Sequence, residues 1–350
     1  MANIARMLTA TRGRGRWDWT DWASYGYLAL GVCIMFGPVL WLAMSSLKSE
    51  AGLSEYPPSL LPTEQVRVSV PGYAAPLPLF TIDAGERAGK QLAEIRRVGI
   101  QAQMVDPTDP KAVIRVPVDG RTKVMRVHAA WDNYTDLIAK YNFGRYLWNS
   151  VFITVIATVL TLLVNSMAAF ALSKYRFSGR DSVFLIMLAT LMIPPTIVLV
   201  PNYLIIAMLG LTSNPWGVIW PAVATPTGVF MLRQYMLTLP DDLIEAARMD
   251  NASEWRIYWR IVLPLSAPAL AVLAIFSVMW RWNEFLWPMV VLSRSETFTL
   301  QLALNSFQGE LTTAWNYLLA MTVLTLLPVS VVFLVLQKYI TQGIASAGVK

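Results

Sequence analysis

Residues 245–264 read EAARMDNASEWRIYWRIVLP, a charged stretch that lies between two long apolar runs. Asp242 and Glu245 are three residues apart, and an acidic pair at this spacing can cap the free amides at the start of a helix. Asn251 tolerates left-handed backbone geometry, which predicts a turn, and Ser253 is a favourable N-cap for a second helix. The stretch therefore predicts two short polar helices with a tight turn between them.

The second of these helices has an aromatic stripe and an arginine pair. Residues at i, i+3, i+4 and i+7 share one helix face, and here they are Trp255, Tyr258, Trp259 and Val262. Arg256 and Arg260 share a different face. A proline at position 264 ends the arrangement where the next apolar run begins.

Two interpretations of this polar helix pair are open. Its arginines could hold an interfacial helix on anionic lipid headgroups, or its first helix could dock into a groove of another protein. The first helix favours docking, because anionic lipid would repel its carboxylates while its small side chains permit close approach. The acidic and small residues concerned are Asp241, Asp242, Glu245, Ala246, Ala247 and Asp250.

The composition is that of an integral membrane protein. Of the 350 residues, 55% are hydrophobic and 14% are charged, whereas soluble domains have about 25% charged residues. The net charge of +6 could indicate nucleic-acid binding, but no basic run is interleaved with the aromatic residues that single-strand binders use. Basic residues in the loops of a membrane protein explain the charge better.

Six apolar runs approach or exceed the roughly 20 residues that cross a bilayer as a helix. They cover residues 25–44, 147–172, 183–209, 216–232, 265–292 and 314–336. The fold class predicted is therefore an all-α membrane protein with six transmembrane helices. The predicted parts are an N-terminal segment (1–24), a first helix (25–45), an inserted module (46–146), a five-helix core (147–338) containing the polar loop 240–264, and a tail (339–350).

Lysine and arginine in the short connections predict the orientation in the membrane. The segments before span one, after spans two and four, and after span six are basic, whereas residues 211–215 have no basic residue and residues 293–313 have only Arg294. Both termini are therefore predicted to be cytoplasmic, and residues 46–146 to lie outside the cell membrane. The basic residues that carry this bias are Arg6, Arg12, Arg14, Arg16, Lys174, Arg176, Arg180, Arg233, Arg248, Arg256, Arg260, Lys338 and Lys350.

The predicted extracytoplasmic segment has the pattern of a small α+β module. Residues 113–127 suggest two short strands around Asp119-Gly120, a dipeptide suited to a tight hairpin. Pro117 lacks a ladder donor, which predicts an edge strand. In residues 85–99, Leu92 and Ile95 have the spacing of one helix face.

Several kinds of chemistry have no support in the sequence. The chain has no GxxxxGK[ST] phosphate loop, so it is not expected to hydrolyse nucleotide unaided. One histidine and one cysteine offer no metal cluster or intrachain disulfide. We therefore expect no catalytic residue, no cofactor and no metal in this chain.

The polar stretch resembles the EAA loop of ABC importer permeases, whose pattern is EAA-x3-G-x9-I-x-L-P. The matching positions are Glu245, Ala246, Ala247, Ile261, Leu263 and Pro264, with Asp250 beside the turn and Asn251 at the family's glycine position. Further resemblance to binding-protein-dependent sugar permeases, of the type of the second maltose permease, lies in residues 56–64, 131–150, 282–288 and 342–350. In those permeases the first two blocks are nearly adjacent, so residues 66–130 read as an insertion here.

The resemblance implies a type I ABC importer permease in the bacterial inner membrane. It implies a second related permease subunit, two ATPase subunits that bind ATP and Mg²⁺, and an extracytoplasmic sugar-binding protein. The polar helix pair would lie in a cleft of an ATPase and transmit its closure to the spans. The substrate implied is a carbohydrate, with oligosaccharides or α-glucosides such as maltose or trehalose foremost.

Polar residues inside the apolar runs are candidates for the substrate path, because ionisable groups in a membrane usually face a cavity or a partner. Arg281 and Glu284 could contact substrate or form a structural ion pair. Asn165 suits packing between helices. Planar aromatic faces beside hydrogen-bonding groups suit sugars, and the full candidate set is Asn165, Trp280, Arg281, Trp282, Asn283 and Glu284.

Other functions compete with the importer permease. An ion-coupled secondary carrier could use Arg281 and Glu284, but it would leave the acidic helix pair unexplained. An ABC permease for a non-sugar solute is a second alternative. A membrane-embedded enzyme would need clustered histidine, cysteine or acidic residues on one membrane face, which the sequence lacks.

Overall fold

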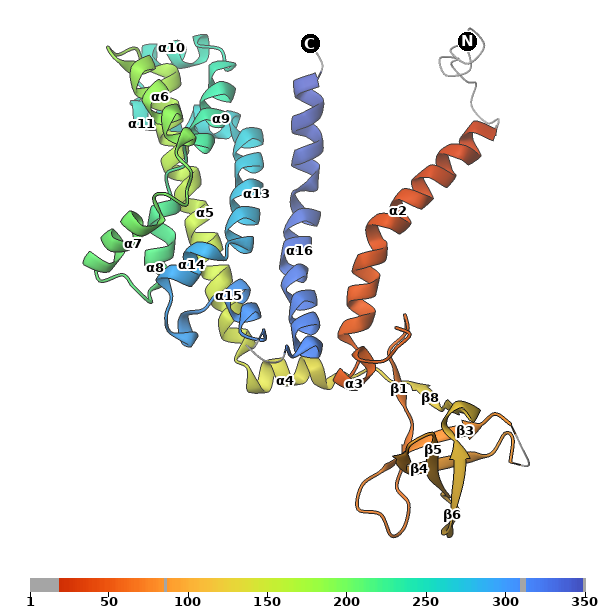
Figure 1. Cartoon of the computed structure of the whole chain (residues 1–350). Coiled ribbons are helices and arrows are strands. Elements are labelled where there is room, and N and C mark those ends of the chain that lie inside the picture. Colours follow the sequence, from red (N-terminus) through yellow and green to blue (C-terminus); the bar gives the residue numbers. More distant parts are fainter. Residues whose placement is uncertain (1–18, 85–86, 309–312, 349–350) are drawn as a thin grey trace. The chain divides into compact units, whose positions relative to one another are not determined.

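The computed structural model describes residues 19–84, 87–308 and 313–348 (Figure 1). The chain divides into two units, Met1–Ala130 and Trp131–Lys350. Of the predicted terminal segments, residues 1–18 and 349–350 lie outside the described residues. The predicted inserted module, 46–146, spans the division, so its last part belongs with the second unit.

The first unit begins with one long apolar helix, α2 (Trp19–Ser46). Its 28 residues rise about 42 Å at 1.5 Å per residue, which is enough to cross a hydrocarbon core about 30 Å thick. The predicted first span, residues 25–44, lies within this helix. Most of its side chains are exposed within this chain, which leaves them available to lipid or to another subunit.

The rest of the first unit is a β-module that follows the short helix α3 (Glu50–Leu53). Strands β1 and β8 form a two-stranded ribbon, while β2 to β6 follow one another in a larger sheet and β7 pairs with β3. The strands are β1 (Thr63–Gln65), β2 (Arg67–Val68), β3 (Leu77–Ile82), β4 (Gln91–Val98), β5 (Gln101–Asp106), β6 (Asp109–Pro117), β7 (Arg121–Lys123) and β8 (Met125–Val127). The predicted α+β module is therefore almost wholly β among the described residues.

The helical prediction for residues 85–99 is wrong, because this segment contains strand β4. Leu92 packs in one apolar cluster with Phe80 and Met104. Ile95 packs against a second cluster that includes Val105. Successive strand side chains point to opposite faces, so the spacing that suits one helix face divides these residues between the two faces of a sheet. Pairing with β3 and β5 overrides the local helical pattern.

The predicted hairpin around Asp119-Gly120 has the right strands but the wrong pairing. Strand β6 pairs with β5, and β7 pairs with β3. Between them, the 3-10 turn η1 (Val118–Gly120) carries the chain from one strand to the other. Pro117 ends β6, which is an edge strand of the sheet as predicted.

The second unit is helical (Figure 1). Its elements are α4 (Asp132–Lys140), α5 (Phe143–Lys174), α6 (Arg180–Ala189), η2 (Thr190–Met192), α7 (Leu199–Met208), α8 (Pro215–Ile219), η3 (Trp220–Ala222), α9 (Pro226–Leu237), α10 (Asp242–Met249), α11 (Glu254–Ile257), the π-helical turn η4 (Tyr258–Val262), α12 (Leu263–Leu265), α13 (Ala267–Asn283), α14 (Leu286–Val291), η5 (Ser295–Thr297), α15 (Leu300–Asn305) and α16 (Trp315–Gly348).

Helix α5 is the central element of this unit, since it contacts α4, α8, α9, α13 and α15. Three buried clusters follow its length. The first joins α5 to α4, α15 and α16 around Phe143, the second joins it to α7, α8 and α14 around Ala157, and the third joins it to α9, α10 and α13 around Phe170. The polar helix pair α10–α11 is therefore anchored at the C-terminal end of α5.

Three helices among the described residues are long and apolar enough to cross a membrane, namely Trp19–Ser46, Phe143–Lys174 and Trp315–Val335. A fourth is reached if Glu254–Leu265 and Ala267–Asn283, which are bent by 76°, are counted as one span. Several membrane helices are thus present, while the count of six remains a prediction.

The predicted third and fourth spans are interrupted. Residues 193–198, with Pro194 and Pro195, separate η2 from α7, and α9 begins at Pro226 after a break that follows η3. Proline has no amide hydrogen and clashes with the preceding helical turn. The interruptions therefore follow directly from these prolines.

Candidate functional site

Helices α10 and α11 form the predicted polar pair, and the turn between them is built as expected. Asn251 has a φ of 54°, in the left-handed region that glycine usually fills. The amide of Asn251 donates to the Arg248 carbonyl, and the amide of Ala252 donates to the Ala247 carbonyl, both at 3.0 Å. This pair of bonds is a Schellman motif that satisfies the last carbonyls of α10. Asn251 thus adopts the left-handed conformation that the sequence predicted for this turn.

Replacing Asn251 tests this role of the turn. Because a left-handed residue without a helpful side chain costs about 1–2 kcal/mol, Asn251→Ala should lower the stability of the loop by about 1 kcal/mol. Asn251→Gly should be neutral or slightly stabilising. The measurement is thermal unfolding of the purified permease in detergent. Equal unfolding temperatures for the alanine and glycine variants would contradict the assigned strain.

The start of α10 is held differently from the predicted acidic cap. Among the described residues, neither Asp241 nor Asp242 accepts a hydrogen bond from an amide of the helix, although Asp241 is the N-cap residue. Instead, Lys174 Nζ donates to Asp241 Oδ1 at 2.6 Å and to the Leu239 carbonyl at 2.7 Å. This bond lowers the pKa of Asp241, so the contact weakens only when the pH falls far enough to protonate the carboxyl group. The last residue of α5 therefore fixes the entry to α10.

Helix α11 begins as predicted and is tied to α10. Ser253 Oγ accepts a hydrogen bond from the Arg256 amide at 3.3 Å. Arg248 donates from Nε to Glu254 Oε1 at 2.8 Å and from Nη2 to Glu254 Oε2 at 3.3 Å. A two-point guanidinium–carboxylate contact fixes both distance and orientation. The two helices are therefore connected by the turn and by this ion pair.

The predicted aromatic stripe on the second helix is divided. Tyr258 and Val262 are buried, whereas Trp255 and Trp259 are exposed. Residues 258–262 form a π-helical turn, which has more residues per turn than an α-helix and rotates the face that follows it. The Tyr258 hydroxyl lies 2.7 Å from Ser166 Oγ of α5. Ile257, which the stripe did not include, is fully buried instead.

The side of the α10–α11 pair that does not pack against α5 is solvent-exposed. Glu245, Ala246, Asp250 and Asn251 are exposed, and no ion pair among the described residues includes Glu245 or Asp250. Exposed apolar side chains lie on the same helix, since 45% of Leu243 and 83% of Met249 are accessible. Of the remaining predicted coupling residues, Ala247 and Leu263 are half-buried against the core and Pro264 is exposed. The outer surface of α10 thus combines carboxylates, small residues and apolar residues.

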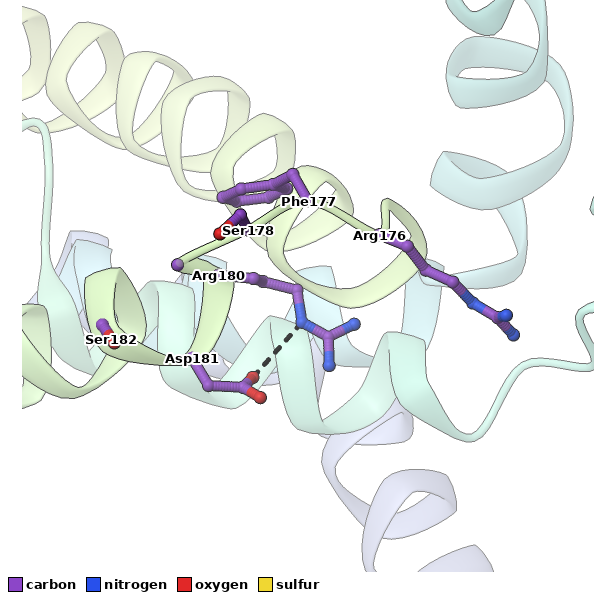
Figure 2. A pocket seen from close by; sticks show the side chains of 7 residues that line it. Arg176, Phe177, Ser178, Arg180, Asp181 and Ser182 are labelled. Atoms are coloured by element: carbon purple, nitrogen blue, oxygen red, sulfur yellow. Dashed lines mark hydrogen bonds and ion pairs between the residues drawn. The ribbon is translucent and has the colours of Figure 1, made fainter.

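A basic connection lies at the same end of α5. Residues 176–182 line an open hollow of about 490 Å³ between α5 and α6 (Figure 2). Arg180 Nε contacts Asp181 Oδ1 at 3.2 Å, and the buried Arg233 of α9 contacts the same oxygen at 3.4 Å. Arg176 points away from this ion pair (Figure 2). Tertiary structure therefore gathers the basic connection and the acidic helix α10 at one end of the second unit.

A second set of polar side chains lies between α5 and α13, inside predicted spans. Arg281 Nη2 donates to Thr161 Oγ1 at 2.5 Å and to the Ala222 carbonyl at 2.6 Å, and its Nε donates to Ser277 Oγ at 3.1 Å. Ala222 ends η3, just before the break in the predicted fourth span. Arg281 thus supplies the hydrogen-bond donor for the Ala222 carbonyl, which the interruption of the predicted fourth span leaves without a helical partner.

Asn165 extends this set towards α9. Its Nδ2 donates to Thr225 Oγ1 at 2.6 Å, and its Oδ1 accepts from the Thr225 amide at 3.1 Å. A Cβ at Gly228 would lie 2.4 Å from Asn165 Nδ2, so the close approach of α5 and α9 requires glycine at that position. We call the whole set the polar seam; it consists of Thr158, Thr161, Asn165, Thr225, Ser277 and Arg281.

The spacing of polar residues in the sequence contains a signal for the polar seam. Thr158, Thr161 and Asn165 have the i, i+3, i+7 spacing of one helix face within an apolar run. Ser277 and Arg281 have the i, i+4 spacing on the facing helix. Two polar stripes of this kind in neighbouring spans predict contact between them.

The remaining candidates for the substrate path lie on different sides of α13. Trp282 is buried and its Nε1 donates to the Thr325 carbonyl at 3.1 Å. Glu284 is not ion-paired with Arg281 among the described contacts; its Oε1 accepts from the Trp287 amide at 3.2 Å. Asn283 and Trp280 are exposed. The structure therefore separates the six candidates into three groups. Asn165, Arg281 and Trp282 bind within the chain between helices, Glu284 accepts an amide of α14, and Trp280 and Asn283 are exposed.

Exposed residues on α13 form a stripe that includes two of these candidates. Phe276, Met279, Trp280 and Asn283 are all exposed, and their spacing places them along one side of the helix. Asn283 Nδ2 donates to the Met279 carbonyl at 2.8 Å, and no donor among the described residues binds its amide oxygen. We call these four residues the α13 stripe.

Comparison with known proteins agrees with this architecture. The profile of the family described as "Binding-protein-dependent transport system inner membrane component" matches residues 165–346. The arabinooligosaccharides transport system permease protein AraQ of Bacillus subtilis (strain 168) is 34% identical over 277 residues, covering 78% of this chain and 90% of that protein. The sn-glycerol-3-phosphate transport system permease protein UgpE of Pectobacterium atrosepticum is 33% identical over 230 residues, covering 65% of this chain and 80% of that protein.

A solved structure shares the fold. It is that of a bacterial ABC transporter involved in the import of the acidic polysaccharide alginate, and one of its chains matches with a TM-score of 0.67 at 22% identity. The match covers 94% of this chain and 99% of that one. The chain therefore has a fold similar to that of a subunit of this importer.

Proposed function

Because the chain belongs to the family of binding-protein-dependent transport system inner membrane components, we propose that it is the permease subunit of an ATP-driven ABC importer for a carbohydrate. The outer surface of α10 carries this proposal. Its exposed carboxylates and small residues, held on a rigidly connected helix pair, suit docking into a partner that binds nucleotide. The surface includes Glu245, Ala246 and Asp250.

The helix pair is built to transmit movement from such a partner. Lys174 fixes the entry to α10, the Arg248–Glu254 ion pair connects α10 to α11, and Tyr258 contacts α5 through Ser166. Force on α10 would therefore reach α5 and α13 through short hydrogen-bonded connections. Partner ATPases that close around ATP and Mg²⁺ would supply that force, and the spans would alternate between inward-open and outward-open states.

The assembly proposed has four kinds of component. Two ATPase subunits bind on the cytoplasmic side, and one of them holds the α10–α11 pair of this chain. A second related permease completes the membrane path, and a soluble binding protein delivers the substrate. The multi-pass chain lies in the inner membrane with both termini cytoplasmic, as the positions of its basic residues favour. The β-module would then lie on the extracytoplasmic side.

The proposed substrate is an oligosaccharide. AraQ, at 34% identity, is a permease for arabinooligosaccharides, and the α13 stripe offers Trp280 as a planar face beside the amide of Asn283. Arg281, Trp282 and Asn165 serve to pack the spans, since their polar atoms bind within the chain. A phosphorylated polyol is the second candidate, because UgpE, at 33% identity, belongs to an sn-glycerol-3-phosphate system.

One experiment tests the assembly and the substrate together. The tagged permease is purified from its native membrane in mild detergent, its partners are identified by mass spectrometry, and the associated binding protein is titrated with a panel of sugars and glycerol phosphates. The expected result is co-purification with ATPases and tightest binding of an oligosaccharide. Absence of any ATPase, or uptake that follows an ion gradient without ATP, would overturn the proposal.

A further inference from the structure

One face of the sheet in the β-module is solvent-exposed next to the apolar cluster that contains Val105. On this face, Arg96 of β4, Gln103 of β5 and Arg115 of β6 are direct cross-strand partners. Strands lie about 4.8 Å apart, so the two arginines originate about 10 Å apart with a glutamine between them. The next row on the face is Val98, Gln101 and Pro117. We call Arg96, Val98, Gln103, Val113, Arg115 and Pro117 the arginine face.

A β-bulge places Arg96 on this face. The register shifts between Glu94 and Arg96, so Ile95 is the extra residue and Arg96, not Ile95, is opposite Gln103. Bulges commonly re-aim a side chain in this way. Arg96 Nε donates to Gln103 Oε1 at 2.8 Å, which orients the guanidinium across the strands.

The arginine face carries positive charge that no carboxylate of the described residues balances. Elsewhere in the module Arg121, Lys123 and Arg126 each pair with a glutamate. No carboxylate pairs with Arg96 or Arg115 among the described residues, and both are exposed. Arg67 of β2 and Arg97 of β4 are also exposed and without an ion pair among the described residues, but Arg97 is opposite Ala102, in a different row from Arg96 and Gln103. Arg96 and Arg115 are the two that the sheet holds in one cross-strand row, on either side of Gln103.

The apolar residues in the rows next to the two arginines indicate a protein partner. Val98 and Val113 are 55% and 54% exposed, and Pro117 ends the edge strand. Arginine with apolar neighbours is typical of interface cores, and a guanidinium matches a carboxylate at two points. The edge itself is a poor template for strand addition, because β6 has prolines at positions 110 and 117. Contact through the face is therefore favoured over contact through the edge.

We propose that the arginine face docks an acidic surface of the soluble binding protein that serves this permease. The inference rests on the proposed function, in which the module lies on the side where that protein arrives, and on the family's dependence on a binding protein. Arg96 and Arg115 steer the loaded binding protein and orient it, while Val98 and Val113 provide the apolar contact. Electrostatic contacts of this kind act mainly on encounter and specificity.

The test uses the whole importer in nanodiscs of zwitterionic lipid. ATPase activity is measured against the concentration of the binding protein that co-purifies with it, for the natural chain and for the double variant Arg96→Glu/Arg115→Glu. The binding-protein concentration for half-maximal activity should rise about tenfold, because two attractive contacts become repulsive. The maximal rate and the basal rate should be unchanged, since neither arginine supports the fold.

A matched control reverses two other exposed arginines of the same module, Arg67→Glu/Arg87→Glu, and should leave the half-maximal concentration unchanged. The neutral variant Arg96→Gln/Arg115→Gln should weaken the salt dependence of the natural chain without reversing it. An unchanged half-maximal concentration in the glutamate variant, or an equal shift in the control, would overturn the proposal.

Two further outcomes separate the proposal from its premises. If the shift appears only when anionic lipid is added to the nanodiscs, the face contacts membrane and not the binding protein, and the proposal fails. If no binding protein stimulates the natural importer, the proposed function itself fails. Stimulation of the natural chain and of the double variant at equal concentrations rejects the docking face alone.

Discussion

Glu245→Lys should abolish ATP-driven uptake while the permease still folds and inserts. Glu245 is exposed on α10 and has no ion pair among the described residues, so its reversal removes nothing that holds the chain together. A like-charge contact in an interface costs several kcal/mol, and each 1.4 kcal/mol changes an equilibrium about tenfold. Uptake should therefore fall by at least about 100-fold, measured with labelled substrate in proteoliposomes.

A control of equal chemistry separates docking from general damage. Glu296 is also exposed and lies on η5, on the connection between α14 and α15. Glu296→Lys makes the same change of charge and should retain uptake. Normal uptake in Glu245→Lys would refute the docking surface, and so would equal losses in the two variants. Co-purification of the ATPase should fall in Glu245→Lys only.

Arg281→Met should destabilise the permease through loss of the polar seam. The change leaves the Ala222 carbonyl and the Thr161 hydroxyl without their guanidinium partner. A buried polar group without a partner costs about 1–3 kcal/mol, and 2 kcal/mol corresponds to roughly 4–8 °C in unfolding temperature for a domain of this size. The measurement is thermal unfolding in detergent, together with uptake at several sugar concentrations.

The two roles considered for Arg281 give different results. A packing residue lowers the unfolding temperature, whereas a substrate contact raises the sugar concentration for half-maximal uptake at constant stability. Arg281→Lys should be intermediate, because an ammonium cannot reproduce the fork of a guanidinium. Arg294→Met is the control, since Arg294 is exposed and should tolerate the change. An unchanged unfolding temperature in Arg281→Met would reject the packing role.

The sequence predicted the elements whose pattern is local. Capping by Ser253 and the left-handed turn at Asn251 depend on a few neighbouring residues, and the structure has both of them. The acidic cap at Asp242 was not formed, because a distant lysine, Lys174, determines how α10 begins.

Non-local contacts explain the other differences. Residues 91–98 form a strand because β3 and β5 lie on either side of β4, and no feature of the segment itself indicates those partners. Arg281 and Glu284 have the spacing of an ion pair, yet Arg281 binds the carbonyl of Ala222 from another helix. Burial and pairing with distant elements thus outweighed local propensity in both places.

By itself, the sequence determined that this is a membrane protein with a polar helix pair, since apolar run length and caps act over a few turns of chain, and the resemblance of that pair to the EAA loop pointed to a permease. Only the tertiary structure decided which polar residues face outward and which hold the spans together. The physical reason is that an intramembrane polar group must find a partner in space, and that partner is usually far away in the chain.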